Sequence, residues 1–362
     1  MTGSPFRHRV GELRPSQIFF TYGIGAITDL PNLSAIVMGL DSWDKSRTHE
    51  LNEARLLAAV RQELGGQVKD LRSPPIPPDT DGSWDPFDES ARIGIPVTPF
   101  PTWMVCPKCR LLAPLQSGLF QLKSNPYRSN ETRYVHLNCP KTQKPPAVIP
   151  SRFLVACEQG HLDDFPWHYF VHRGPSDCRG SLRLEEYGVT GSATDIMVRC
   201  SCNVPGRRLS DAFGESGKQT LPRCRGRHPH IHSFDDECSQ QMRGLLLGAS
   251  NGWFGITLSA LSIPIATHQL TQRIQDHWVI LGKATSLETL QVLLSALQAT
   301  GQLQEFAKYS VADIWQTIQA IQQGDTTPNA QDLKTPEWEV FSLAVRIQNS
   351  PEFQLRPVGK RI

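Results

Sequence analysis

The chain contains 362 residues, with 37 Lys and Arg against 35 Asp and Glu. This length is about twice that of a typical domain, so we expect two or three hydrophobic cores. Because the charges nearly balance, net charge gives no reason to expect a nucleic-acid partner, and any basic surface must be local.

The sequence shows no sign of export or membrane insertion. Its first twenty residues include basic side chains but lack the apolar stretch of a secretory signal. Residues 244–272 carry no formal charge, but polar residues and turn formers such as Gly252 and Pro264 interrupt them. We therefore interpret this stretch as a buried segment of a soluble core and not as a membrane span. A cytoplasmic protein is expected.

Two segments precede the cysteine-rich part of the chain. Residues 1–72 are predicted to form an N-terminal α/β segment, with a helix within residues 50–64 that Gly65 and Gly66 end. Residues 73–102 are predicted to be a connecting wrap, because eight prolines lie between Ser73 and Pro101 and such a density excludes regular elements.

The remaining chain divides at about residue 240. Residues 103–240 hold all nine cysteines, short β-like runs such as RFLVA (152–156) and SLRLEEY (181–187), and many turn residues, which is typical of a double zinc-binding region. Residues 241–362 are predicted to form a helical subdomain, with Ser286 and Ser310 as helix caps and Gly301 as a terminator. The expected fold class is α+β, with a turn-rich, zinc-ribbon-like centre and a C-terminal helical subdomain.

The cysteines suggest two structural zinc sites. Cys106 and Cys109 form a Cys-x-x-Cys pair, which presents two thiolates to one Zn²⁺, although a redox pair has the same spacing. The first predicted ligand set is Cys106, Cys109, Cys139 and Cys157, with His161 as the alternative to Cys157. The second set is Cys200, Cys202, Cys224 and Cys238, with Cys178 as a competitor or a free thiol. The other interpretation is that several of these are ordinary buried cysteines.

The run CEQGHLDDFPWHYFVH, residues 157–172, concentrates three histidines and two aspartates. A short apolar-faced helix is expected after Pro166. His168 and His172 have the spacing of a two-histidine metal face, but no Glu follows His168, so we favour structural packing for both. Asp163 and Asp164 are expected to cap that helix or to contact a partner.

Several stretches resemble the DrmB family, accessory subunits of the bacterial anti-phage system DISARM. They are RPSQIFFTYGIGAITDLP (14–31), MGLDSWD (38–44), RFLVACEQGHLDDFPWHYFVHRG (152–174), CRGSLRLEE (178–186), CRGRHP (224–229) and LLLGASNGWFGITLSALSIP (245–264). The resemblance implies a partner of the superfamily 2 helicase DrmA that acts on foreign DNA. Members of the family usually end in a further cysteine-bearing module, related to the zinc-binding domain of MrfA-type helicases, and we expect this chain to lack it.

Three functions are compatible with these features. The first is a non-catalytic zinc-binding subunit that binds a DrmA-like helicase and helps to hold DNA; the lysine-containing SGKQ and LGKA stretches do not match an ATP-binding P-loop. Its expected phosphate contacts are Arg207, Arg208, Arg223, Arg225 and Arg227. The second is a metal-dependent nuclease built on His161, Asp163, Asp164, His168 and His172. The third is a scaffold that never contacts DNA.

Overall fold

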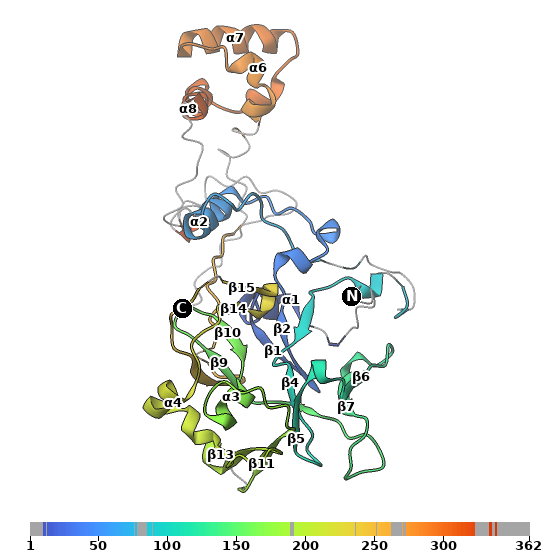
Figure 1. Cartoon of the computed structure of the whole chain (residues 1–362). Coiled ribbons are helices and arrows are strands. Elements are labelled where there is room, and N and C mark those ends of the chain that lie inside the picture. Colours follow the sequence, from blue (N-terminus) through green and yellow to red (C-terminus); the bar gives the residue numbers. More distant parts are fainter. Residues whose placement is uncertain are drawn as a thin grey trace, which may run out of the picture. The chain divides into compact units, whose positions relative to one another are not determined.

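The computed structural model combines short sheets with helices, which confirms the α+β class (Figure 1). It describes residues 10–11, 13–75, 77, 85–88, 90–188, 192–235, 237–250, 252–261, 270, 273–322, 333–334 and 337–338. The chain divides into two compact units. The first comprises Met1–His49 and Ser73–Thr257, and the second Glu50–Arg72 and Leu258–Ile362.

A six-stranded antiparallel sheet organises the first unit. Its strand order is β13 (Arg207–Arg208), β12 (Ile196–Cys200), β11 (Leu182–Glu186), β5 (Leu111–Pro114), β4 (Trp103–Val105) and β8 (Ile149–Pro150). Alternating Leu182, Leu184, Ile196 and Val198 are buried, as expected for strands with one face on a core. The prediction of a strand in SLRLEEY is therefore confirmed.

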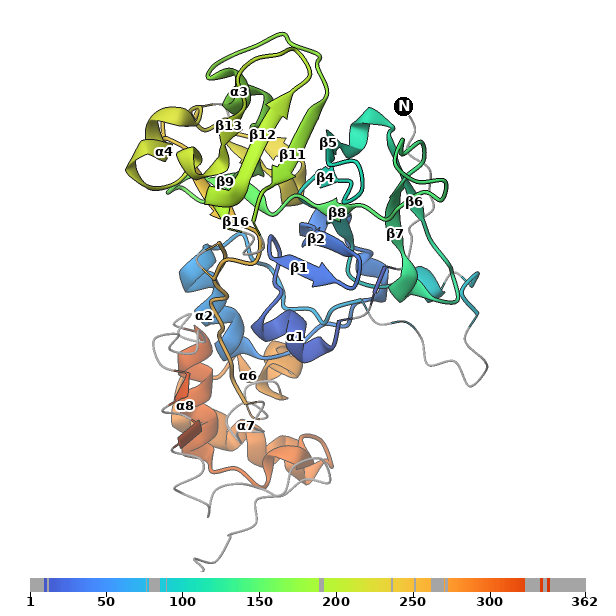
Figure 2. The same cartoon turned by 90° about the horizontal axis from the view of Figure 1, so that it is seen from below.

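Two three-stranded antiparallel sheets and two hairpins complete the β-structure. One sheet joins β1 (Ile27–Leu30), β2 (Leu33–Val37) and β3 (Val97–Pro99), and the other joins β10 (Leu162–Asp164), β9 (Phe153–Ala156) and β16 (Arg243–Leu246). The hairpins are β6 (Phe120–Lys123) with β7 (Arg133–His136), and β14 (Arg227–His228) with β15 (Ser233–Phe234). The β6–β7 hairpin lies beside β4 and β5 in both views (Figure 1, Figure 2).

The expectation that no regular element forms in the Pro-rich segment is wrong for β3. Val97 and Thr98 pair with Val37 and Ile36, and Pro99 stands at the end of an edge strand, where its missing N–H is tolerated. The next residue, Phe100, is 1% exposed and packs with Ile36, Met38 and Leu154.

Short helices cover this unit: α1 (Pro15–Phe20), α3 (Trp167–His172) and α4 (Gly214–Thr220). The predicted helix after Pro166 is confirmed as α3. Its Trp167, Phe170 and Val171 follow the i, i+3, i+4 pattern of one helix face, and all three are buried in the main core with Phe153.

The second unit contains α2 (Ala54–Leu64), α6 (Trp278–Leu281), α7 (Leu287–Ala299) and α8 (Val311–Gln322). Leu290 and Leu294 of α7 pack with Ile314 and Ile318 of α8. The predicted cap is confirmed, because Ser286 Oγ accepts from the N–H of Thr289 at 3.2 Å. Gly301 follows α7 with a φ of 81°, as its role as terminator requires.

The buried core segment expected at residues 244–272 is not found in residues 252–261, whereas residues 251, 262–269 and 271–272 of this stretch lie outside the described residues. Phe254 and Ile256 are 74% and 88% exposed, so this part of the stretch is not a buried core segment. Among the described residues, no helix combines the length and apolar character needed to cross a membrane.

Candidate metal centres

Four buried side chains form the first candidate centre: Cys106, Cys109, His136 and Cys139. The two cysteines of the first pair lie in the turn between β4 and β5, where Arg110 takes a left-handed conformation (φ 64°). His136 ends β7, and Cys139 follows three residues later. Cys106 Sγ lies 3.8 Å from Cys139 Sγ, and Cys109 Sγ lies 3.5 Å from His136 Nδ1. Two sulfurs on one tetrahedral zinc are about 3.8 Å apart, so this spacing fits Zn²⁺.

Cys157, His161, Cys224 and Cys238 form the second centre. Cys157 and His161 flank the β9–β10 turn, and Cys157 Sγ lies 3.2 Å from His161 Nδ1. The other ring nitrogen, His161 Nε2, lies 2.7 Å from the carboxylate of Asp235. A carboxylate on the far nitrogen fixes the orientation and tautomer of a metal-binding histidine. Asp235 therefore directs Nδ1 of His161 towards the sulfurs.

The third centre contains His172, Cys178, Cys200 and Cys202. His172 ends α3 and Cys200 ends β12, so a helix and a strand of the main core meet here. Cys178 Sγ and Cys200 Sγ are 3.7 Å apart, and His172 Nε2 lies 3.3 Å from Cys202 Sγ. Nδ1 of His172 bonds to the carbonyl oxygen of His168 at 2.7 Å, which leaves Nε2 for the centre.

A Cys-Arg-Gly motif recurs in two of these centres. The N–H groups of Gly180 and Gly226 donate to the sulfurs of Cys178 and Cys224 at 3.3 and 3.2 Å. A Cβ atom on Gly180 would lie 2.6 Å from Cys200 Sγ, and Gly226 has a φ of 69° with backbone atoms of Asp235 close by. The glycines thus allow the chain to approach the sulfurs closely.

The structure groups the predicted ligands differently from the expectation. Cys106, Cys109 and Cys139 do come together, but His136 is the fourth member. Cys157 lies instead with His161, Cys224 and Cys238, and the pair Cys200 and Cys202 lies with Cys178. The reason is topological: β9 and β10 carry Cys157 and His161 to the segment before β14, whereas β12 carries Cys200 to α3.

Two members of the candidate centres, His136 and His172, are not among the ligands predicted from the sequence. His136 stands three residues before Cys139, which is the Cys-x-x-Cys spacing with histidine in place of the first cysteine, and the sequence therefore contains this signal. The sequence favours packing for His172 because no Glu follows His168, and the partners of His172 in the centre lie up to 30 positions away, where no local pattern indicates them.

In each centre the pKa of one cysteine is raised and that of another is lowered. Burial is the main cause that raises the pKa of Cys109 and Cys200 to about 11 and that of Cys224 to about 12, with neighbouring thiols adding to the shift. Burial also acts to raise the pKa of Cys139 and Cys157, but hydrogen bonds outweigh it and lower both, and hydrogen bonds, first that from the backbone N–H of Val204, lower the pKa of Cys202 to about 6. Burial lowers the pKa of His161, but its hydrogen bonds to Asp235 and Cys157 outweigh burial and raise it to about 9. A bound cation would supply the positive charge that these sulfurs need to ionise.

The donor sets contain only sulfur and imidazole nitrogen, four per centre. Such sets hold Zn²⁺ in closed structural sites, whereas catalytic zinc keeps a position open for water or substrate. The first group is fully buried, the second almost so, and the third includes the exposed Cys202. All three are compatible with metal binding, and the chemistry of their donors favours a structural ion.

Comparison with known proteins identifies the family. The sequence profile of the "Domain of unknown function (DUF8724)" matches residues 14–254. The chain belongs to the DUF8724 family. It is also 33% identical over 171 residues to the "DISARM protein DrmB" of Bacillus paralicheniformis, an alignment that covers 47% of this chain and 29% of that protein. The chain thus aligns with less than a third of that relative's length.

The region that defines DUF8724 includes all three candidate centres, because their members lie between Cys106 and Cys238. The similarity to DrmB agrees with the resemblance seen in the sequence. The chain is therefore a DrmB-like member of DUF8724.

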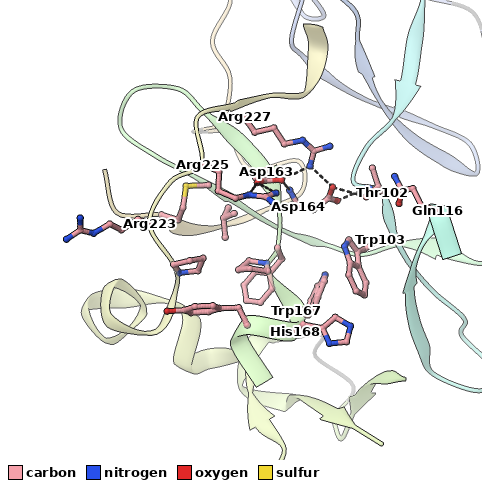
Figure 3. Close-up of a pocket in the computed structure, with 16 residues that line it drawn as sticks. Thr102, Trp103, Gln116, Asp163, Asp164, Trp167, His168, Arg223, Arg225 and Arg227 are labelled. Atoms are coloured by element: carbon pink, nitrogen blue, oxygen red, sulfur yellow. Dashed lines mark hydrogen bonds and ion pairs between the residues drawn. The ribbon is translucent and has the colours of Figure 1, made fainter. Parts of the chain in front are cut away.

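Beside the second centre, two aspartates and two arginines form an ion-pair cluster in which Asp163 is buried and Arg225 is exposed (Figure 3). Arg225 Nε and Nη2 donate to Asp163 at 3.0 and 2.6 Å, and Arg227 donates to both Asp163 and Asp164. Asp164 also accepts from the backbone N–H and the hydroxyl of Thr102, at 2.6 and 2.8 Å. The expectation that these aspartates cap α3 is wrong: both lie in β10, and Pro166 precedes α3 without a side-chain cap.

The five predicted phosphate-binding arginines have different surroundings. Arg207 is largely buried, bonds to Asp211 and the carbonyl oxygen of Phe170, and lies over the Phe170 ring. Arg225 forms an ion pair with Asp163, and Arg227 forms ion pairs with Asp163 and Asp164. Arg208 and Arg223 are exposed, and neither has a carboxylate partner within the described part of the chain.

The residues of the nuclease alternative do not converge on one point. His161 faces Cys157 and Asp235, whereas Asp163 is engaged by Arg225 and Arg227. His172 faces Cys202 in a different centre. A two-metal site needs several carboxylates directed at the same ions, and Asp163 and Asp164 are directed at guanidinium groups.

Proposed function

We propose that this chain is a zinc-binding accessory subunit of a DISARM-like anti-phage complex. In this role it works in the cytoplasm, carries no catalytic site, binds a DrmA-like helicase and helps to hold DNA. The similarity to DISARM protein DrmB supports the assignment to the defence system. The observation that carries the physical part of the proposal is the set of three four-membered Cys/His groups in one compact unit.

Zinc at these centres would make a turn-rich unit rigid. The segments that hold the candidate ligands are mostly short strands and turns, and the members of each centre span between 30 and 81 residues of the sequence. A structural Zn²⁺ contributes roughly 10 kcal/mol or more of apparent folding free energy at neutral pH. A rigid platform positions surface groups for a partner better than flexible loops do.

DNA contact in this proposal is local. Arg208 and Arg223 are the exposed arginines with free guanidinium groups among those predicted, and Arg225 is held in place with a 66% exposed side chain. Arg207 and Arg227 instead make hydrogen bonds and ion pairs within the protein. The pairing of arginines with aspartates is the observation that favours the alternative of a scaffold without DNA contact.

The proposal is tested by co-expressing the chain with a DrmA-like helicase of the same genome and purifying the complex. We expect a stable complex that binds a fluorescent DNA duplex. The double variant Arg208→Glu, Arg223→Glu should weaken this binding and reduce the slope of log Kd against log salt by about two, because each phosphate contact contributes about 0.9.

The matched control is Lys123→Glu, Lys144→Glu, which reverses two exposed charges elsewhere in the unit. Failure to form any complex would contradict the helicase partnership. If the arginine variant has the same DNA affinity and the same salt slope as the parent complex, these arginines do not contact DNA. That result would favour the alternative of a scaffold without DNA contact.

A further inference from the structure

Three exposed arginines lie on one face of the main sheet, where β11, β12 and β13 run side by side (Figure 2). The register places Arg183 of β11 directly opposite Arg199 of β12, and Arg208 of β13 opposite Met197, two residues along β12 from Arg199. Partners across an antiparallel pair point to the same side of a sheet. The alternate residues of β11 and β12 pack into the main core on the other side. The three arginines therefore share the outer face of these strands.

Arg183 and Arg199 form an unfavourable pair. Side chains directly opposite each other on antiparallel strands have Cβ atoms roughly 4.5–5.5 Å apart, and like charges at that distance destabilise a sheet. Glu185 compensates one of them, because its carboxylate accepts from Arg199 Nε at 2.8 Å. Arg183 forms no ion pair with any residue that the structure describes. The fold thus keeps a charge here that does not serve its stability.

The outer face has an excess of positive charge. Glu185 is the carboxylate that shares it with the three arginines. Two neighbouring carboxylates are paired with other arginines: Asp211 with Arg207, and Glu186 with Arg110 and Arg152. A face on which arginines outnumber carboxylates in this way is complementary to a polyanion.

The Arg199 side chain is held in place at both ends. A Cβ atom on Gly206 would lie 3.1 Å from Arg199 Cγ, so the absence of a side chain there leaves room for the arginine stem. At the other end, Nη2 of Arg199 donates to the hydroxyl of Tyr187 at 3.3 Å, in addition to the bond to Glu185. A guanidinium group that is already positioned loses less side-chain entropy when it binds a partner.

We infer that this outer face binds the phosphate backbone of duplex DNA, with Arg183, Arg199 and Arg208 as the contacts. The choice of DNA rests on the proposed function, whereas the surface and its residues rest on the sheet. Side chains that stand on a flat sheet face reach phosphate oxygens and do not enter a groove. Phosphate contacts carry no sequence information, so binding through this face is independent of sequence and weakens with salt.

The variant Arg183→Thr tests the inference, because threonine suits a strand and removes the repelling charge. We expect the duplex Kd of the helicase complex to rise roughly threefold or more, and the slope of log Kd against log salt to fall by about one. The melting temperature of the chain should stay the same or rise, because the repulsion from Arg199 is relieved.

Two further variants accompany it. Arg183→Lys is the matched control: it keeps the charge and should retain most of the affinity. Replacing all three arginines by threonine should lower the salt slope by about three. The measurements use two duplexes of unrelated sequence, and both should lose affinity to the same extent because the contacts are to phosphates.

The outcomes separate this inference from the proposed function. If the single and triple variants bind duplex DNA like the parent complex, with the same salt slope, the outer face is not the DNA surface, while DNA binding by the complex stands. If the parent complex binds no DNA, both proposals fail. A loss confined to one duplex sequence contradicts a phosphate contact. A lower melting temperature of Arg183→Thr would show that the arginine stabilises the fold, and would also overturn the inference.

Discussion

At the scale of single residues, burial and ionisation oppose each other in the candidate centres. Cys109, Cys200 and Cys224 have pKa values raised to about 11, 11 and 12, chiefly by burial. Without a cation, these groups are therefore protonated thiols at pH 7. A metal ion binds the thiolate form, so it must expel their protons.

This competition predicts proton release when the metal-free chain takes up zinc. Because protons and metal compete for the same sulfurs, zinc affinity should rise with pH and fall on acidification. Isothermal titration in buffers of different ionisation enthalpy measures the protons released, and we expect several per chain at pH 7. Zinc uptake without proton release would contradict the description of these thiols.

Other residue roles depend on partners that no local pattern reveals. Asp163 and Asp164 looked like helix caps because they precede α3, yet their carboxylates bond to Arg225 and Arg227, more than 60 residues away. Eight cysteines, and the two alternates His161 and Cys178, were recognised as candidate ligands from residue type and spacing. Their grouping depends on strand pairing, which the spacing does not contain.

At the scale of elements, local signals predicted the helices α2, α3, α7 and α8 and the strands β9 and β11. The caps of α7 and α8, the face of α3 and the strands β9 and β11 follow from residue patterns a few positions long. β3 was missed because its prolines outweighed Val97 and Thr98, although an edge strand accepts a terminal proline. The domain boundaries near residues 72, 102 and 240 stay predictions.

The cap of α7 provides a local test. Ser286→Ala removes the bond to the N–H of Thr289 and should destabilise the helix by about 1 kcal/mol. Ser295→Ala, an exposed change within the same helix, is the control and should have little effect or stabilise slightly. Hydrogen exchange of residues 287–299 reports both. Equal protection in the two variants would show that Ser286 does not act as a cap.

At the scale of the whole molecule, the two units rely on different sources of stability. The first unit combines an apolar core with three Cys/His groups, whereas α7 and α8 of the second unit pack through leucine and isoleucine side chains. All members of the three groups lie in the first unit. Metal loss should therefore affect the first unit and leave the second one folded.

Elemental analysis of the purified chain, before and after chelation, is the most direct test of the metal centres. We predict about three zinc ions per chain, corresponding to the three groups. Their removal should abolish hydrogen-exchange protection in residues 103–240 while α7 and α8 stay protected. A chain that contains no stoichiometric transition metal, or whose first unit melts identically after chelation, would contradict the account.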